Sequence, residues 1–249
     1  MEVDNETQSV VDYAIADQEF MALIPAVYQG ALHTYAAGAQ SGTYTTSCDS
    51  LVFVNGKQDS AVYVFNPSGQ TCSLAMPDGK IRTGKVSVRL NGKIKSTGSK
   101  ITLKLIEYAA DGISYSCDSI VLITKESTAT YATFGVKLVN GSCKTGDYTI
   151  KYKFDRTFLV YPQGDNNSES VAYIYGEASG TNRQGTNFST QILQDKPLVK
   201  HKTCRYIGRG IMELTPEGFK TRTINFGEGA CDDEATFTVK ENTVAFKLK

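Results

Sequence analysis

The chain contains no tryptophan and only two histidines among its 249 residues. Histidine is the side chain that most often serves as a general base near neutral pH. His33 and His201 have no evident companions, which makes a Ser-His-Asp or Cys-His site hard to assemble. They also lie far apart in the sequence, and no Cys-x-x-Cys occurs, so a zinc site is not expected. The formal net charge is zero, from 26 basic and 26 acidic residues, so the sequence predicts no nucleic-acid partner. No apolar run reaches the roughly 18 residues of a membrane span, and the start MEVDNETQ does not resemble a signal peptide.

One stretch, residues 6–34, has the apolar spacing of a helix. Pro25 should kink or break it, and Gly30 should end it. We therefore expect a helix over residues 8–24 that lies outside the sheets and packs on one of them as a peripheral element. A partner-binding or tether-proximal helix is the alternative. On this view, deletion of residues 1–34 should leave the remaining chain folded.

Beyond Gly38 the sequence changes to short runs in which apolar and polar residues alternate, separated by Gly, Asn, Asp and Pro. Tight turns are predicted at Pro77–Lys80, Leu90–Lys93, Ala110–Ile113 and Pro216–Phe219, because Asp-Gly and Asn-Gly supply the positive φ of hairpin turns. The fold class predicted is all-β, with antiparallel sheets in a sandwich or in stacked hairpin repeats, and one N-terminal α-helix. Residues 1–38 would form the helix and a tether-proximal segment, and residues 39–249 the β domain.

The six cysteines fall into three couples, each with roughly 25 residues between its members. The segments that begin at Cys48 and Cys117 have nearly the same sequence, CDSLVFV and CDSIVLI. A glycine turn precedes the second cysteine of each couple. Since a hairpin brings its two outer ends together, three bridges are predicted: Cys48–Cys72, Cys117–Cys143 and Cys204–Cys231. Six free thiols are the alternative. Disulfides would indicate an oxidising compartment outside the cytoplasm.

The turn that ends at the last cysteine contains two glycines, Gly227 and Gly229, which we expect in a tight turn or a bulge. Its acidic residues are a candidate calcium site, because hard cations prefer several oxygen ligands from one loop. They lack the spacing of an EF-hand, and solvated turn residues are the simpler interpretation. The candidates are Glu228, Asp232, Asp233 and Glu234.

No catalytic constellation stands out, and no cofactor is expected. A carboxylate pair could serve a glycosidase, but the sequence does not single out one pair among its 26 acids. Tyr173 and Tyr175 lie two residues apart, on one face of a predicted strand, and form a candidate platform for stacking a sugar. Packing against neighbouring strands is the alternative for both.

Several segments resemble a group of uncharacterised Bacteroidota envelope lipoproteins. The resemblance rests on MPDGKIRTGKVSV, EASGTNRQGTNFSTQI, KTCRYIGRGIMEL and NFGEGACDDEATFTV, and on the helix ETQSVVDYAIADQEFM, which is similar to the segment after the lipidated cysteine of that group. It spans nearly the whole chain and is strongest over residues 69–85 and 176–240. Two positions depart from the group's pattern: Tyr206 stands where it has Trp, and Glu228 where it has Asp.

The resemblance implies secretion and anchoring to the outer membrane through a lipid that this chain does not carry. It implies no known activity. The expectation is thus a non-enzymatic cell-envelope or surface protein with a binding or structural role, whose partner is a glycan or another envelope protein. A carbohydrate-binding or carbohydrate-active surface protein is the alternative.

Overall fold

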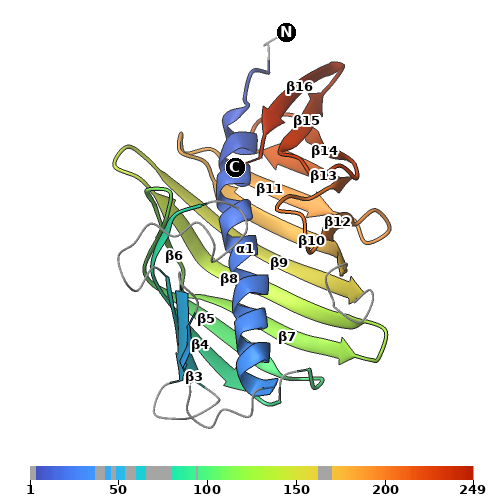
Figure 1. Ribbon diagram of the computed structural model, residues 1–249. Helices are drawn as coiled ribbons and strands as arrows, with labels where there is room; N and C mark the ends of the chain where they lie inside the picture. Colours follow the sequence, from blue (N-terminus) through green and yellow to red (C-terminus); the bar gives the residue numbers. More distant parts are fainter. Residues whose placement is uncertain are drawn as a thin grey trace.

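The computed structural model describes residues 4–36, 43–45, 49–53, 60–65, 80–93, 95–161 and 170–248. Within these residues, a single helix, α1 (Gln8–Ala36), crosses one face of a curved antiparallel sheet (Figure 1). The strands of the sheet are β1 (Thr43–Thr45), β2 (Asp49–Phe53), β3 (Ser60–Phe65), β4 (Arg82–Asn91), β5 (Lys100–Ala110), β6 (Ile113–Ser116), β7 (Ser119–Ser127), β8 (Ala132–Lys144), β9 (Thr149–Tyr161), β10 (Val171–Thr181), β11 (Asn187–Ile192), β12 (Leu198–His201), β13 (Arg209–Pro216), β14 (Arg222–Glu228), β15 (Glu234–Val239) and β16 (Asn242–Lys247).

The strands follow one another through the sheet almost in the order of the sequence. The exceptions are β7, which pairs with β5 and β8, and β12, which pairs with β10 and β13. The predicted fold class, antiparallel β with one N-terminal helix, is therefore confirmed. The described strands form one continuous sheet, however, and not a sandwich or a stack of separate sheets. The predicted boundary between residues 38 and 39 lies outside the described residues.

The sequence pattern explains this arrangement locally. Exposed and buried residues alternate along most strands, and most regularly along β9 and β11, so one face of the sheet is apolar and the other is in water. The turn at Asp111 and Gly112 has φ values of 47° and 79°, as a two-residue hairpin of this type requires. Gly92 and Gly218 also have positive φ, in two other predicted turns.

The prediction of a peripheral helix is wrong. The helix begins at Gln8 as expected, but it continues through Pro25 and past Gly30 to Ala36. Nearly every residue from Ser9 to Ile24 is buried, and these residues share one hydrophobic core with the strands. Aromatic contacts join the two, for example Phe20 with Tyr115 at 5.6 Å between ring centroids. The helix is thus the element around which the sheet packs.

Acidic residues of the N-terminal segment and the helix meet arginines of the sheet, and we call these contacts the helix ion pairs. They are Asp4–Arg222, Asp12–Arg183 at 2.6 Å, Asp17–Arg156 at 2.6 Å and Glu19–Arg82 at 2.9 Å. The arginines come from β14, the β10–β11 turn, β9 and β4, and are thus spread across the sheet from β4 to β14. Since they converge on one helix, the sheet has to curve around it.

Tyrosines complete two of the helix ion pairs. Tyr152 donates a hydrogen bond of 2.7 Å to Asp17, and Tyr13 donates one of 3.0 Å to the same carboxylate. Tyr108 donates to Glu19, which also pairs with Lys80 at 3.2 Å. Burial raises the pKa of each of these three tyrosines, and the neighbouring carboxylate raises it further, so all three hydroxyls stay protonated and act as donors.

Helix geometry explains why different strands are engaged. Asp12 and Glu19 are seven residues apart and lie on the same side, whereas Asp17 points about 140° away from Asp12. A helix with acids on two sides can be buried only if each acid finds a cation, because an unpaired buried charge costs several kcal/mol. The helix ion pairs therefore fix both the rotation and the position of α1 in the sheet.

The cysteines give a mixed outcome. The Cys204–Cys231 disulfide is confirmed, and it brackets the β13–β14 hairpin as expected. The predicted Cys117–Cys143 bridge is wrong, because both thiols are free. Cys143 faces Tyr115 in the β6–β8 register, which makes Cys117 a diagonal neighbour roughly 7 Å away, beyond the roughly 4 Å between the Cβ atoms of a disulfide. Cys48 and Cys72 lie outside the described residues.

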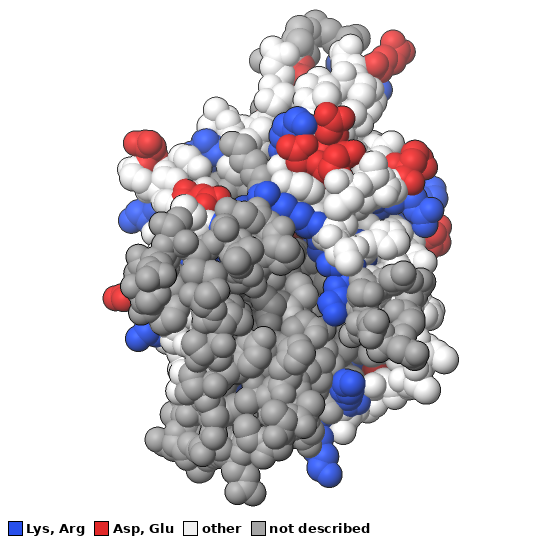
Figure 2. All heavy atoms as spheres, in the orientation of Figure 1, with Lys and Arg blue, Asp and Glu red and all other residues white. Residues whose placement is uncertain are grey.

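The described surface on the helix side carries both acidic and basic side chains (Figure 2). Among the described residues, no helix is long and apolar enough to cross a membrane.

Candidate functional site

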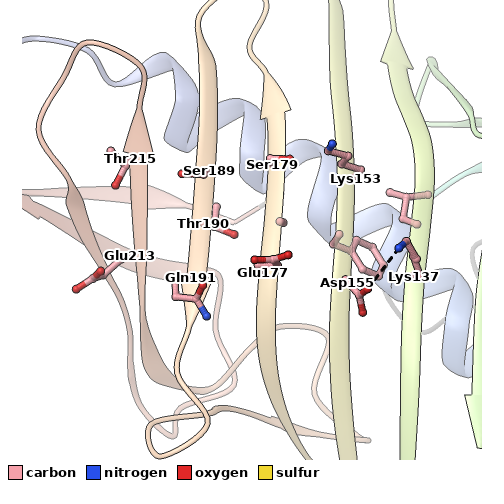
Figure 3. A pocket seen from close by; sticks show the side chains of 13 residues that line it. Lys137, Lys153, Asp155, Glu177, Ser179, Ser189, Thr190, Gln191, Glu213 and Thr215 are labelled. Atoms are coloured by element: carbon pink, nitrogen blue, oxygen red, sulfur yellow. Dashed lines mark ion pairs between the residues drawn. The ribbon is translucent and has the colours of Figure 1, made fainter.

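A groove of about 470 Å³ lies on the sheet face opposite the helix, across β8, β9, β10, β11 and β13. Figure 3 shows this face from close by, with α1 behind the sheet. We call it the outer groove. Its volume is within the range of known ligand sites, roughly 300–1,000 Å³.

Two rows of polar side chains line the outer groove, and the register of the sheet places them. The first row crosses five strands: Lys137, Asp155, Glu177, Gln191 and Glu213 are consecutive cross-strand partners. The second row, one pleat away, contains Lys153, Ser179, Ser189 and Thr215. The rows are parallel because side chains of one face recur every second residue on each strand. The groove therefore presents carboxylates, an amide, hydroxyls and ammonium groups side by side.

A glycine next to the first row brings β10 close to β9. Gly176 has a φ of +127°, and a Cβ at this position would lie 2.4 Å from the carbonyl oxygen of Asp155. Glycine inside a strand often marks a bend or a close approach of two backbones. Here it precedes Glu177, so the distortion lies at the middle of the outer groove.

The charges in the outer groove are solvated. Lys137 pairs with Asp155 at 3.5 Å, and their side chains are 61% and 60% exposed. Glu177 and Glu213 form no ion pair with other described residues, and they too are exposed. An exposed pair of this kind contributes about 0–1 kcal/mol to stability. These side chains are thus available to a ligand at little cost to the fold.

A second pocket, of about 340 Å³, lies further along the same face, and we call it the tyrosine pocket. Tyr173 of β10 and Ile211 of β13 line it. These residues lie on the strands of Glu177 and Glu213, four and two positions away, so the pocket continues the groove. Polar residues from three segments complete the lining: Lys196, Arg209, Asn225 and Glu228.

A β-bulge shapes the tyrosine pocket. Arg209 pairs with Glu228, whereas Ile211 pairs with Asn225, so β14 has one extra residue at this point. In a regular strand, residues 225 and 228 would point to opposite faces. The bulge turns both toward the pocket, with Gly227 at a φ of +88°. The prediction of a bulge or tight turn is confirmed for Gly227, and Gly229, just beyond β14, has a φ of +123°.

The two tyrosines of the predicted sugar platform have different surroundings. Tyr173 lines the tyrosine pocket, and its ring meets the ring of Tyr161 edge to face at 5.8 Å. Tyr161 in turn contacts Tyr131 at 5.9 Å, so three aromatic rings form a row on neighbouring strands. Tyr175 instead packs, half-buried, against the hydrophobic core.

The predicted calcium candidates do not converge. Asp232 accepts a hydrogen bond from the backbone N–H of Glu234, and Lys247 pairs with both Asp233 at 2.6 Å and Glu234 at 3.2 Å. Glu228 lines the tyrosine pocket instead. Among the described residues, no group of three or more His, Cys, Asp or Glu side chains could hold a metal ion. Asp233 and Glu234 are instead engaged by Lys247.

Sequence reasoning did not find the first row of the outer groove. Each of its five residues occupies an ordinary exposed position of an alternating strand, and nothing in one strand marks it. Only the register of five strands brings them into line. The signal available in the sequence was the glycine at position 176, inside a predicted strand.

Comparisons of the chain with protein-family models, with curated proteins and with solved structures found no match.

Proposed function

We propose that this chain is a non-enzymatic binding protein of the cell envelope or cell surface, and that it holds a glycan in the outer groove. The observation that supports this is the first row of the groove, in which five polar side chains from five strands stand in line. A glycan offers hydroxyl groups that both donate and accept, and such a row supplies both acceptors and donors.

The dimensions and the surroundings favour the same ligand class. Neighbouring strands are about 4.8 Å apart, so the row from Lys137 to Glu213 is about 19 Å long, which suits a short oligosaccharide. Tyr173 and Ile211 at the adjoining pocket offer an aromatic and an apolar surface for the carbon-bound hydrogens of a sugar ring. Specific pockets combine such surfaces with a few placed polar groups.

The second candidate, a carbohydrate-active enzyme, has one observation in its favour. Asp155 and Glu177 are direct cross-strand partners, and glycosidases use two carboxylates at short separation. Both side chains are exposed, however, and Asp155 is paired with Lys137. A general acid in these enzymes usually depends on burial to hold its proton. The open groove therefore favours binding over hydrolysis.

The Cys204–Cys231 disulfide supports a location outside the cytoplasm, because reducing compartments rarely preserve structural disulfides. A location in the envelope, with lipid anchoring as in the lipoproteins that the sequence resembles, belongs to this proposal. Protease shaving of intact cells tests it: loss of the full-length protein under conditions that leave a cytoplasmic marker intact is expected, and full protection would contradict surface exposure.

Binding is tested by calorimetric titration of the full chain with cellotetraose, maltotetraose and xylotetraose. At least one should bind, and the double variant Glu177→Ala, Gln191→Ala should remove that binding while the melting temperature is retained. Glu241→Ala, an exposed change in the β15–β16 turn, is the matched control and should bind as the parent does. Absence of binding across the panel, or binding indifferent to the double variant, would contradict the proposal.

The same samples distinguish the second candidate. After long incubation, chromatography should recover the tetrasaccharides intact. Shorter products that disappear with Glu177→Gln would establish the enzyme and overturn the non-enzymatic assignment.

A further inference from the structure

We propose that the tyrosine pocket is an anion subsite that selects the acidic end of the glycan, so that the ligand is an oligosaccharide capped by a carboxylate-bearing sugar. The inference rests on the proposed function and assigns an end, a charge and a direction to the ligand. It is carried by the difference in charge between the two adjoining sites.

The outer groove is acidic and the tyrosine pocket is basic. The groove is lined by Asp155, Glu177 and Glu213 against two lysines. The pocket is lined by Lys196 and Arg209 against Glu228 alone. A ligand that is anionic along its whole length would be repelled by the groove, whereas one with a single terminal carboxylate fits both sites.

The two cations of the pocket are unengaged by other described residues. Neither Lys196 nor Arg209 forms an ion pair within the described part of the chain, although Arg209 faces Glu228 in the register. The guanidinium group can hold a carboxylate through two parallel hydrogen bonds. Both side chains are exposed at the pocket, so little protein structure has to be broken before they bind.

The backbone that carries these groups is braced on both sides. Lys200 donates to the carbonyl oxygens of Cys204 at 2.7 Å and Arg205 at 2.6 Å, and the Cys204–Cys231 disulfide links this segment to the one after Glu228. Gly208 N–H, next to Arg209, donates to Val199 O at 3.0 Å. The pocket is therefore held in shape before a ligand arrives, which lowers the entropic cost of binding.

Asn225 adds a donor in a defined orientation. Its side-chain oxygen accepts from the backbone N–H of Gly227 at 2.9 Å, which leaves the amide NH₂ for the pocket. An amide donor beside a guanidinium and an ammonium group is suited to a carboxylate or to its neighbouring hydroxyl. Tyr173 provides the wall against which the sugar ring lies.

Matched pairs of oligosaccharides test the inference: cellotetraose, maltotetraose and xylotetraose, each with and without a terminal glucuronic acid. The acidic member should bind about tenfold more tightly, the gain expected of one charge-assisted bidentate contact. Arg209→Gln should abolish that preference, Arg209→Lys should retain only part of it, and Glu228→Gln should increase it. Lys240→Gln, an exposed change in another turn, should leave the preference as it is.

The outcomes separate this inference from the proposed function. Equal affinity for acidic and neutral members, with loss of both upon Glu177→Ala, Gln191→Ala, would overturn the anion subsite and leave the glycan groove in place. Binding of acidic members that is indifferent to Arg209→Gln would also overturn the subsite. Absence of binding by every member of the panel would overturn both.

Discussion

The two faces of one sheet use the same kinds of residue for opposite purposes. On the inner face, Asp17 and Arg156 pair at 2.6 Å with side chains 10% and 1% exposed. On the outer face, Lys137 and Asp155 pair at 3.5 Å with side chains 61% and 60% exposed. The difference in burial decides what each pair does, because breaking a buried pair strands a charge in the core whereas an exposed pair exchanges its partner for water.

The inner face therefore governs folding, and the outer face is available for recognition. A helix with carboxylates on two of its sides fits only the sheet whose arginines meet them, so the pairs specify where α1 lies more than they add to stability. The side chains of the first row of the outer groove do not fix the position of α1. They can be changed, or engaged by a ligand, with small effects on the fold.

The largest effect expected is from removal of the helix. A chain lacking residues 1–24 should show no cooperative thermal transition, because the apolar face of the sheet and four arginines would lose their partners. A chain lacking only residues 1–3 is the control. Circular dichroism melting curves distinguish a helix that belongs to the core from a peripheral one. A cooperative transition in the chain that lacks residues 1–24 would show that the helix is peripheral.

Arg156→Met should destabilise the protein by about 3–5 kcal/mol, since it leaves Asp17 charged and buried. Adding Asp17→Leu should recover part of that loss, because the pair is then replaced by apolar groups. Urea unfolding of the two variants measures both effects. A loss of unfolding free energy below about 1 kcal/mol for Arg156→Met would show that the Asp17–Arg156 pair contributes no more than an exposed ion pair.

The disulfide should contribute about 3 kcal/mol, the value expected for a loop of its length. Cys204→Ala with Cys231→Ala should lower the unfolding free energy by that amount, measured by urea titration.

Cys117→Ser is the comparison from the half of the sheet without a described bridge. Burial raises the pKa of the Cys117 thiol to about 11, so an alkylating reagent at pH 8 should modify it slowly in the folded state.

Alkaline pH should weaken the inner face. Burial, and then the neighbouring carboxylates, raise the pKa of Tyr13, Tyr108 and Tyr152 well above 10 in the folded chain. In the unfolded chain these tyrosines ionise near pH 10, so the unfolded state loses protons that the folded state keeps. Stability should be unaffected below about pH 10 and should fall as the pH rises above it.

The phenolate absorbance of the chain measures the ionisation of its tyrosines directly, since no tryptophan absorbs in the same region. These three tyrosines should titrate only as the protein unfolds. Tyr152→Phe should remove one of the late titrating groups. Ionisation of all fourteen tyrosines near pH 10 with the fold intact would contradict their burial.

The sequence predicted what is local. Alternating runs and Asp-Gly turns indicate antiparallel strands wherever they occur, and the β13–β14 hairpin with its disulfide follows from them. It also predicted the start of the helix. Burial of the helix was missed because the charges of Asp12, Asp17 and Glu19 suggest exposure to water until their arginine partners, 63 to 171 residues away, are placed.

The outer groove could not be predicted from the sequence for the same reason: its residues are distant in the sequence and only the fold brings them together. Tyr173 was singled out because a tyrosine repeat is visible in one strand, and the structure places it in a pocket. Glu177 and Glu213 carry no local mark, and they become neighbours in the outer groove only through the register. The Cys117–Cys143 prediction failed on register too, by a single pleat.

A pair of double-mutant cycles tests the contrast between the faces most directly. Asp17→Asn and Arg156→Gln, singly and together, form the inner cycle, and Lys137→Gln and Asp155→Asn form the outer one, all measured by urea unfolding. The predicted coupling energy is about 2–3 kcal/mol for the inner pair and below about 0.5 kcal/mol for the outer pair. Equal coupling in the two cycles, or a larger value on the outer face, would contradict the contrast between a buried pair that stabilises the fold and an exposed pair that does not.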